Sequence, residues 1–447
     1  MELPFFSNPV DVYARLERMG EPALLDSGNN AERGRYDIIA VEPIERFNLD
    51  LSAKLSSSEL NTKLGHWLGL ARTMVQSRKS SHPALPFAGG LIGYFSYELG
   101  RRLMGLSADP RASLPLACVR YYPWAVVQDQ LLQKSYLVGD PERVRSIGDD
   151  VARNLHQDLP PPSQSFLLQE RFRCPWSLQA YAEKFAQVRA YLESGDFYQI
   201  NLGQPFSAPY SGSLREAYRR LRKVARAPYS ALLPQGTGQP LMSLSPERFI
   251  GVSRRRIETR PIKGTRPRSP DLHADRAAAA ELLESEKERA ENLMIVDLLR
   301  NDIGRYCEAG SVNVDQLFQL ESYKTVHHLV SVISGTLRDG ARPLDALLGS
   351  LPGGSITGAP KRRSMEIIDQ LEPASRELWC GTTFYASADG RIDSNIMIRS
   401  LYAKGGRLHC WAGGGLVYDS EPEMEYREQE DKVGAFLREL ERTLPDS

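Results

Sequence analysis

Two pairs of glutamates have the residue type and spacing to bind a divalent cation. Glu288 and Glu291 are three residues apart in one helix-forming segment, and Glu425 and Glu428 are three apart in another. Residues at this spacing lie on one face of a helix. Four carboxylates brought together would repel one another unless a hard cation such as Mg²⁺ lay between them. The alternative is that these glutamates are solvated or pair with basic residues such as Lys432.

A single lysine is a candidate nucleophile or base. Lys263 lies among arginines in the segment ETRPIKGTRPR, residues 258–268, where a predicted strand passes into a loop. Neighbouring cations favour the uncharged form of an amine, which is the nucleophilic form. An exposed basic loop without catalytic function is the alternative.

Two glycine-rich segments could approach an anionic ligand closely. In LPGGSITGAPKRRSMEII, residues 351–368, a turn leads into a predicted helix whose first N–H groups suit a carboxylate or phosphate. It is not a nucleotide-binding Walker loop, because Gly358 is not followed directly by Lys and Ser or Thr. Three further glycines, 413–415, permit close backbone approach to a ligand, with a tight bulge as the alternative.

The histidines give no hydrolase signature. His327 and His328 begin an apolar run, where a packed histidine is the common explanation. Neither a Ser-His-Asp order nor an HExxH motif is apparent in the sequence.

Composition limits the class of protein that carries these residues. The chain has 447 residues, of which 41% are hydrophobic and 25% charged, which is typical of a globular protein and excludes disorder. Lys plus Arg and Asp plus Glu both number 56, so we expect no general attraction to nucleic acid or to anionic membranes. We also expect no export signal and no membrane span. The five cysteines form no CxxC pair, which favours a reducing compartment, the cytoplasm.

Hydrophobic periodicity predicts a mixed α/β fold. Helices are expected over residues 178–192, 277–302 and 420–444, the last with Ser420 and Glu423 at capping-box spacing. Strands are expected over residues 197–206 and 407–420, the second broken by its three glycines. The proline run LPPPSQS, residues 159–165, is the best boundary between an N-terminal region, 1–160, and a second region, 171–440.

Several motifs taken together resemble the chorismate-utilising enzymes. The segments that carry the resemblance are SLSPERF (243–249), RPIKGT (260–265), ENLMIVDLLRND (291–302), LPGGSITGAPK (351–361) and AGGGLVYDSEPEMEYREQEDK (412–432). The resemblance implies two intertwined subdomains, like those of anthranilate synthase component I, whose antiparallel sheets pack as a sandwich with helices outside. It identifies residues 171–440 as the chorismate-binding catalytic region.

Within this family the lysine of the PIKGT motif marks the branch that converts chorismate and ammonia into 4-amino-4-deoxychorismate, for p-aminobenzoate and folate synthesis. Anthranilate synthase component I normally carries alanine there. By this resemblance Lys263 attacks C2 of chorismate and forms a covalent intermediate, while Glu247 acts first as general acid and then as general base. Anthranilate synthase component I and a non-catalytic tryptophan-binding relative remain the alternatives.

The resemblance also assigns the cofactor and the remaining substrate contacts. It implies Mg²⁺ bound by Glu291 and Glu428, with Glu288 and Glu425 acting through waters. It places His328 near the reacting hydroxyl and the following residues at substrate carboxylates or as donors: Ser355, Thr357, Tyr385, Arg399, Gly414, Gly415 and Lys432. Relatives commonly carry Gly where this chain has Phe384. Isochorismate and salicylate synthases carry a lysine at Gln199, so their water chemistry is disfavoured.

The resemblance implies two further binding partners. No sequence typical of a glutamine amidotransferase is apparent, so we expect a separate glutamine amidotransferase subunit to supply ammonia. The segments PALLDSG (22–28) and RYDIIAVEP (35–43) look like the tryptophan-pocket elements of the family. L-Tryptophan is therefore a possible ligand of Ser27, Pro228 and Tyr229, although Asp26 stands where feedback-inhibited relatives often have Glu.

Overall fold

The computed structural model describes residues 1–28, 34–53, 85–160, 164–323 and 326–442, together with the single residues 59, 62, 66, 69 and 444. The predicted boundary at 159–165 lies partly outside these residues. Within the described part of the chain, no helix is both long and apolar enough to cross a membrane. All five cysteines are free thiols, and four of them are buried.

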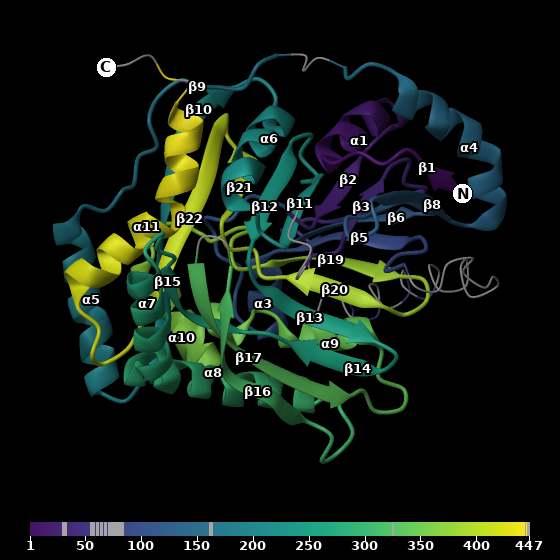
Figure 1. The fold of residues 1–447 in the computed structure, drawn as a ribbon. Coiled ribbons are helices and arrows are strands. Elements are labelled where there is room, and N and C mark those ends of the chain that lie inside the picture. Colours follow the sequence, from purple (N-terminus) through teal and green to yellow (C-terminus); the bar gives the residue numbers. More distant parts are fainter. Residues whose placement is uncertain are drawn as a thin grey trace.

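The strands form two antiparallel sheets, seen as the upper and lower layers of Figure 1. The first sheet has the order β1-β8-β7-β3-β2-β11-β12-β21-β22-β10-β18, with β9 also paired to β10. Its strands are β1 (Glu2–Leu3), β2 (Ala23–Asp26), β3 (Tyr36–Ala40), β7 (Trp124–Asp129), β8 (Lys134–Gly139), β9 (Leu167–Leu168), β10 (Gln199–Ser211), β11 (Tyr229–Pro234), β12 (Pro240–Ser245), β18 (Gly358–Ala359), β21 (Ser400–Lys404) and β22 (Arg407–Leu416).

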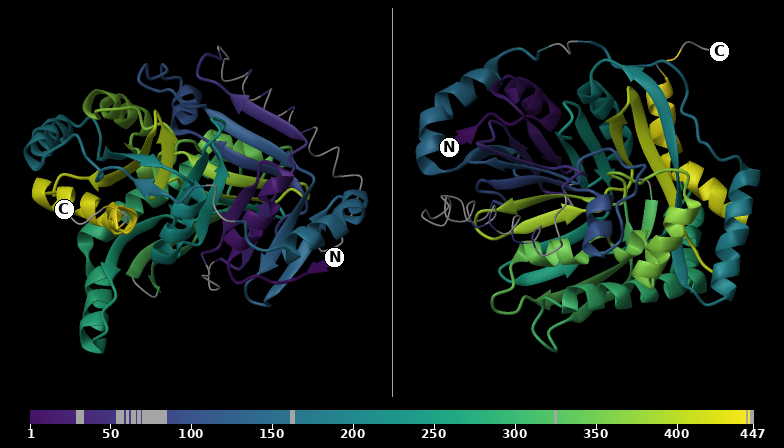
Figure 2. Two further views of the ribbon diagram at one scale, coloured as in Figure 1. Left: turned by 90° about the horizontal axis from the view of Figure 1, so that it is seen from above. Right: turned by 180° about the vertical axis from the view of Figure 1, so that it is seen from behind.

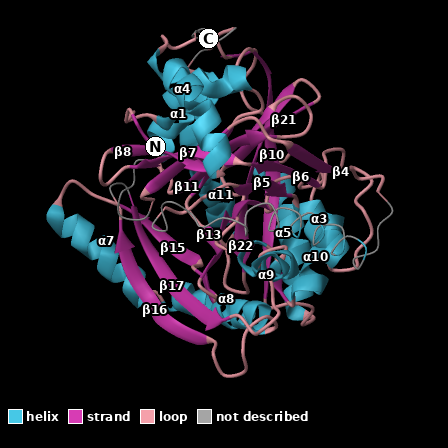
Figure 3. Ribbon diagram, turned by 90° about the vertical axis from the view of Figure 1, so that its right-hand side faces the viewer, coloured by secondary structure: helices cyan, strands magenta, loops and turns pink. Residues whose placement is uncertain are grey.

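The second sheet has the order β15-β17-β14-β13-β20-β19-β5-β6-β4, with β16 also paired to β17. Its strands are β4 (Glu45–Leu49), β5 (Gly90–Phe95), β6 (Ala117–Tyr122), β13 (Arg248–Ser253), β14 (Arg256–Thr259), β15 (Ile262–Pro267), β16 (Asn313–Ser322), β17 (Val326–Thr336), β19 (Thr382–Ser387) and β20 (Ile392–Asn395). Figure 3 shows β15, β17 and β16 side by side at one end of this sheet.

Helices cover the outer faces of both sheets. They are α1 (Pro9–Leu16), α3 (Tyr97–Leu103), α4 (Pro141–His156), α5 (Leu178–Glu193), α6 (Leu214–Ala225), α7 (Leu272–Glu284), α8 (Glu286–Gly304), α9 (Pro343–Ser350), α10 (Lys361–Leu371) and α11 (Pro422–Glu441), with short 3₁₀ turns η1 (Glu17–Met19) and η2 (Gly354–Ile356). Helices α1, α4, α6 and α11 pack on the first sheet through one apolar cluster. Helix α7 projects from the body of the molecule (Figure 2).

Buried apolar residues join the two sheets. One cluster contains Ile38 and Ala231 from the first sheet and Ile92 from the second. A larger cluster contains Tyr402 and Trp411 of the first sheet, strands of the second, and the buried face of α8. Burial of this apolar surface is the main stabilising contribution to such a sandwich. The predicted mixed α/β fold with two antiparallel sheets and helices outside is confirmed.

Both sheets combine the two regions separated in the sequence. In the first sheet β2 pairs with β11, and in the second β5 pairs with β19. The predicted division at 160 therefore separates segments of sequence that share both sheets.

Three predicted features differ from the structure. Residues 277–302 do not form one helix: α7 ends at Glu284, and the Ser285 hydroxyl accepts a hydrogen bond from the Glu288 N–H to begin α8. The predicted capping box is also wrong, because α11 begins at Pro422 and Ser420 donates instead to Glu425. The three glycines of β22 do not break the strand, since they pair in register with residues 201–203 of β10.

Candidate active site

Strand β15 lies close to α8 and beside β17 in the second sheet (Figures 1 and 3), and it carries Lys263. The Lys263 Nζ is 4.0 Å from Glu291 Oε2 of α8, with both side chains about one-tenth exposed. Gly415 of β22 lies on the other side: a Cβ there would be 3.6 Å from Lys263 Nζ and 2.2 Å from Gln199 Nε2. A side chain at 415 would therefore displace the Gln199 amide but would only touch Lys263.

Glu247 lies in the tight connection between β12 and β13. Its backbone is fixed on both sides, because its N–H donates to Ser245 Oγ at 3.2 Å and its carbonyl accepts from the Ile396 N–H at 3.2 Å. The buried carboxylate accepts a hydrogen bond from Ser355 Oγ at 3.1 Å. Burial raises the pKa of Glu247 to about 7, although the positive charge of Lys263 and the Ser355 bond oppose the increase. A carboxyl with this pKa can both donate and accept a proton near neutrality.

The first glutamate pair faces β15 from the start of α8. Burial raises the pKa of Glu291, with Lys263 opposing and Glu288 reinforcing the effect. Glu288 is 3.4 Å from Arg266 Nη1. Gly264, at φ +79°, lies so close to Glu288 that an added Cβ would be 3.0 Å from its Oε2.

The second glutamate pair lies on α11, and each of its carboxylates also pairs with a basic side chain. Glu425 is buried and accepts hydrogen bonds from Lys287 Nζ at 3.2 Å and from Ser420 Oγ at 2.8 Å. Glu428 pairs with Lys432 at 2.7 Å. Burial alone would raise the pKa of Glu428, but Lys432, Lys287 and Lys263 outweigh it and lower the pKa.

The four glutamates thus form one cluster of interacting charges between α8 and α11. Carboxylate oxygens are the donors that Mg²⁺ prefers, so the donor chemistry fits. In the described part of the chain, no three His, Cys, Asp or Glu side chains lie close enough together to hold a metal ion. Basic side chains stand between the glutamates instead. Magnesium binding therefore stays a prediction.

Gly414 and Lys432 lie beside this cluster, as predicted for carboxylate contacts. Lys432 Nζ donates to the Gly413 carbonyl at 3.0 Å. A Cβ at Gly414 would be 3.1 Å from Glu425 Oε2 and 3.9 Å from Lys432 Nζ. The close approach of β22 and α11 thus depends on glycine at 414.

His328 lies on β17, next to β15, and Arg399 is close enough to it to interact electrostatically. His328 Nδ1 is 2.8 Å from Thr265 Oγ1, on the residue paired with it between β15 and β17. Burial and the charge of Arg399 lower the pKa of His328 to about 3, so its imidazole is neutral at physiological pH. Arg399 is partly exposed, desolvation by the surrounding protein lowers its pKa, and no carboxylate of the described residues pairs with it. A guanidinium without a counter-ion among these residues suits a carboxylate of the substrate.

Three of the predicted substrate contacts have protein partners in the structure, and their contact with substrate stays a prediction. Ser355 donates to Glu247, and Thr357 Oγ1 donates to the Gly353 carbonyl at 2.9 Å. Tyr385 lines a second cavity, where its ring meets Phe87 edge-on at 5.9 Å. Its neighbour Phe384 stacks on Phe95 at 4.5 Å.

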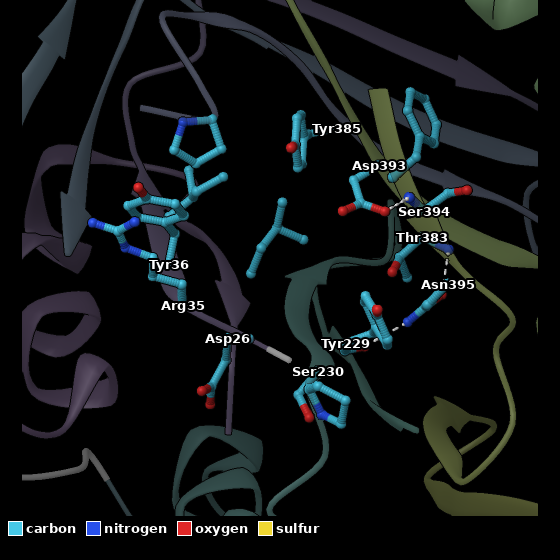
Figure 4. A pocket seen from close by; sticks show the side chains of 16 residues that line it. Asp26, Arg35, Tyr36, Tyr229, Ser230, Thr383, Tyr385, Asp393, Ser394 and Asn395 are labelled. Atoms are coloured by element: carbon cyan, nitrogen blue, oxygen red, sulfur yellow. Dashed lines mark hydrogen bonds between the residues drawn. The ribbon is translucent and has the colours of Figure 1, made fainter. Parts of the chain in front are cut away.

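The second cavity has a volume of about 230 Å³ and lies between the two sheets (Figure 4). Pro228 and Tyr229 line it, as predicted for a tryptophan pocket, together with Asp26. Ser27 does not line it, because its N–H and hydroxyl both donate to the buried Asp37 at 2.7 Å. Tryptophan binding there stays a prediction.

Sequence reasoning missed the basic residues that compensate the glutamates. Lys287 and Arg266 were not assigned a role, yet they contact Glu425 and Glu288. Lys287 precedes Glu291 by four residues on a helix, a spacing that indicates a charge pair along one face. No sequence signal indicated that Lys287 would reach across to α11.

Comparison with known proteins supports the resemblance to the chorismate-utilising enzymes. The family model of the chorismate binding enzymes matches residues 20–438. Aminodeoxychorismate synthase component 1 of Klebsiella aerogenes is 44% identical over 91% of this chain and 90% of its own length. Anthranilate synthase component 1 of Thermus thermophilus is 37% identical over 97% and 95%. The crystal structure of anthranilate synthase component I from Streptococcus pneumoniae superposes with a TM-score of 0.77 at 29% identity, covering 91% of this chain and 92% of that one.

Proposed function

The chain belongs to the chorismate-binding enzymes, and from this premise we propose that it is component 1 of an aminodeoxychorismate synthase. It converts chorismate and ammonia into 4-amino-4-deoxychorismate and water, for p-aminobenzoate synthesis. The observation that carries this proposal is the position of Lys263, which lies between Glu247 and Glu291 at the junction of the two sheets. Of the two relatives named above, the one from Klebsiella aerogenes has the higher identity, and it is an aminodeoxychorismate synthase component 1.

Replacing the C4 hydroxyl by nitrogen at the same carbon requires two displacements. In the first, the Lys263 amine bonds to C2, the ring double bonds shift, and the C4 oxygen leaves as water after taking a proton from Glu247. In the second, ammonia bonds to C4, the double bonds shift back, and the bond between C2 and Lys263 breaks. Glu247 then accepts the proton that the new amine releases. A pKa of about 7 suits this carboxyl for both proton transfers.

Other residues of the site hold the substrate. Arg399, which pairs with no carboxylate of the described residues, binds the enolpyruvyl carboxylate with two parallel hydrogen bonds. His328, neutral because of its lowered pKa, offers a hydrogen bond near the departing hydroxyl. Gly414, Gly415 and Lys432 lie where backbone and ammonium groups can contact the ring carboxylate.

Ammonia is supplied by a separate glutamine amidotransferase subunit. The name of the Klebsiella aerogenes relative, component 1, supports this arrangement. Free ammonium at alkaline pH should replace the partner in an assay, because ammonia is small and uncharged in its reactive form.

The catalytic prediction is tested by mass spectrometry of the products. Purified protein incubated with chorismate, Mg²⁺ and ammonium should form aminodeoxychorismate. Lys263→Ala should lose that product, because the lysine amine can no longer bond to C2, or form anthranilate instead if ammonia bonds to C2 in its place. Lys134→Ala, at an exposed lysine paired with Glu2, is the matched control and should behave as wild type. Anthranilate from the wild-type protein would refute the assignment.

Magnesium is proposed to bind Glu291 and Glu428, with Glu288 and Glu425 acting through waters. When bound it would neutralise the ring carboxylate of the substrate and the charge of the cluster. Removing divalent cations with EDTA should abolish turnover, and Mg²⁺ should restore it. Calorimetric titration with Mg²⁺ in the presence of chorismate gives an independent readout, and Glu428→Gln should weaken the binding.

The second cavity is proposed to bind an aromatic amino acid, with L-tryptophan as the candidate. Tyr36, Tyr229 and Tyr385 supply an aromatic wall, and Asp26 and Asp393 supply carboxylates (Figure 4). Calorimetric titration with tryptophan measures this directly, and an absence of binding heat at millimolar concentration would contradict it.

A further inference from the structure

The turn between α9 and α10 contacts the catalytic carboxyl rather than open space. Ser355, within η2, donates its hydroxyl hydrogen bond to Glu247 Oε1 at 3.1 Å, and the two residues are 7% and 5% exposed. The glycine-rich sequence of this turn suggested a site for an anionic ligand. In the structure the Ser355 hydroxyl of this turn instead donates to Glu247 of the same chain.

A buried arginine fixes the turn next to Ser355. Arg376 donates to the Ile356 carbonyl at 2.8 Å and to the Asn201 carbonyl of β10 at 2.7 Å. It also pairs with Glu372 at 2.6 Å, and both side chains are 1% exposed. Its guanidinium lies over the rings of Tyr97 and Trp379 at 4.8 and 4.7 Å. These contacts tie the residue after Ser355 to the first sheet.

A second buried ion pair ties the ends of the turn to α8. Lys361 Nζ is 2.7 Å from Asp302 Oδ2 and also donates to the Ser350 carbonyl at 3.3 Å. Lys361 and Asp302 are 7% and 5% exposed. Because α8 also carries Glu291, the turn and the carboxylate beside Lys263 share one rigid support.

Two glycines bring the turn against its supports. A Cβ on Gly354 would lie 2.4 Å from Leu298 Cδ2 of α8, and one on Gly353 would lie 2.9 Å from Ile396 Cδ1. Ile396 is also the residue whose N–H bonds the Glu247 carbonyl. Ile396 thus contacts both the turn and the backbone of Glu247, which leaves little freedom in the distance between Ser355 and Glu247.

We propose that Ser355 is a positioning residue that orients the Glu247 carboxyl for proton transfer, and that Arg376 and the Asp302–Lys361 pair hold Ser355 in place. The proposal rests on the proposed function of Glu247 as acid and base. The hydrogen bond from Ser355 stabilises the charged carboxylate and so lowers its pKa, against the increase caused by burial. The other titratable groups that interact electrostatically with Glu247 are Lys263 of β15 and Cys380, which follows α10.

The test compares Ser355→Ala with Ser355→Thr, which keeps the hydroxyl. In Ser355→Ala the pH midpoint of kcat/KM that belongs to Glu247 should move upward by roughly one unit, because a hydrogen bond to a charged group contributes on that order. The value of kcat should fall about tenfold with KM for chorismate unchanged within about twofold, and Ser355→Thr should restore both readouts. Ser364→Ala removes a buried hydroxyl of α10 that donates to Pro360, and it should leave the midpoint unchanged.

Two results would overturn the proposal. A Ser355→Ala variant with raised KM and an unmoved midpoint would show that the hydroxyl binds substrate, and a variant identical to wild type would show that it has no role. If the wild-type protein makes no aminodeoxychorismate, the proposed function fails by itself. Infrared titration of the carboxyl, assigned with Glu247→Gln, would then still show whether removal of the Ser355 hydroxyl raises its pKa.

Discussion

Two arginines, the buried Arg376 and the partly exposed Arg399, show how the site differs from the core at the scale of single residues. Arg376 has a carboxylate partner, Glu372, two backbone carbonyls and two aromatic faces. Arg399 has no carboxylate partner among the described residues, and burial lowers its pKa. A paired buried charge is costly to disrupt, whereas an unpaired one is costly to keep. This difference supports the proposal that Arg399 binds an anion rather than stabilising the fold.

Neutral substitutions at these two positions should have opposite effects on stability. Arg399→Met should raise the free energy of unfolding by about 1–2 kcal/mol, because it removes an uncompensated charge, and should weaken chorismate binding by roughly 10- to 100-fold. Arg376→Met should lower the free energy of unfolding by about 3–5 kcal/mol, because Glu372 is left buried without its partner. Urea unfolding and chorismate saturation curves measure both quantities. Loss of stability in Arg399→Met would contradict a role confined to substrate binding.

At the scale of elements, one sequence signature had two outcomes. Ser285 with Glu288, and Ser420 with Glu423, both have the spacing of a capping box. Ser285 does cap α8 and separates it from α7, although helix-forming residues on both sides gave no sign of a break. Ser420 instead donates to Glu425 of the glutamate cluster, and α11 starts after it. The local sequence pattern predicts an N-cap, but the residues that the fold places nearby determine which hydrogen bond the serine makes.

Strand geometry explains which substrate contacts could be predicted. Lys263, Glu247 and Glu291 were identified from motifs of the chain, and the structure brings them together. Tyr385 was placed with them, but successive side chains of a strand point to opposite faces of the sheet. On β19, Phe384 stacks on Phe95 while Tyr385 meets Phe87 at the second cavity. The motif predicts that Tyr385 lies on a strand, but it does not show which way the side chain faces.

At the scale of the whole molecule, the pairing of strands binds the two sequence regions into one body. The pairs β2–β11 and β5–β19 each join a strand before residue 160 to one after residue 171. The apolar cluster around Ile92 and Ala231 likewise draws on both regions. The proline-rich segment, which lies partly outside the described residues, could not show that strands on either side of it would return to the same sheets.

This shared architecture predicts one cooperative unfolding transition rather than two. Residues 1–160 and 171–440 expressed separately should not fold, because each fragment would expose unpaired strand edges and half of a shared apolar core. Co-expression of the two parts of the full chain, cut only between residues 160 and 164, preserves every described strand pair and should restore the folded protein and its turnover. Calorimetry and amide hydrogen exchange of the intact chain and of the fragments measure whether each unfolds cooperatively.

A cooperative transition in the isolated fragment 171–440 would show that this region folds alone and that the N-terminal strands are an addition to it. We expect the reverse, because Glu247, the proposed acid and base, follows β12. Strand β12 pairs with β11, and β11 in turn pairs with β2 of the N-terminal region.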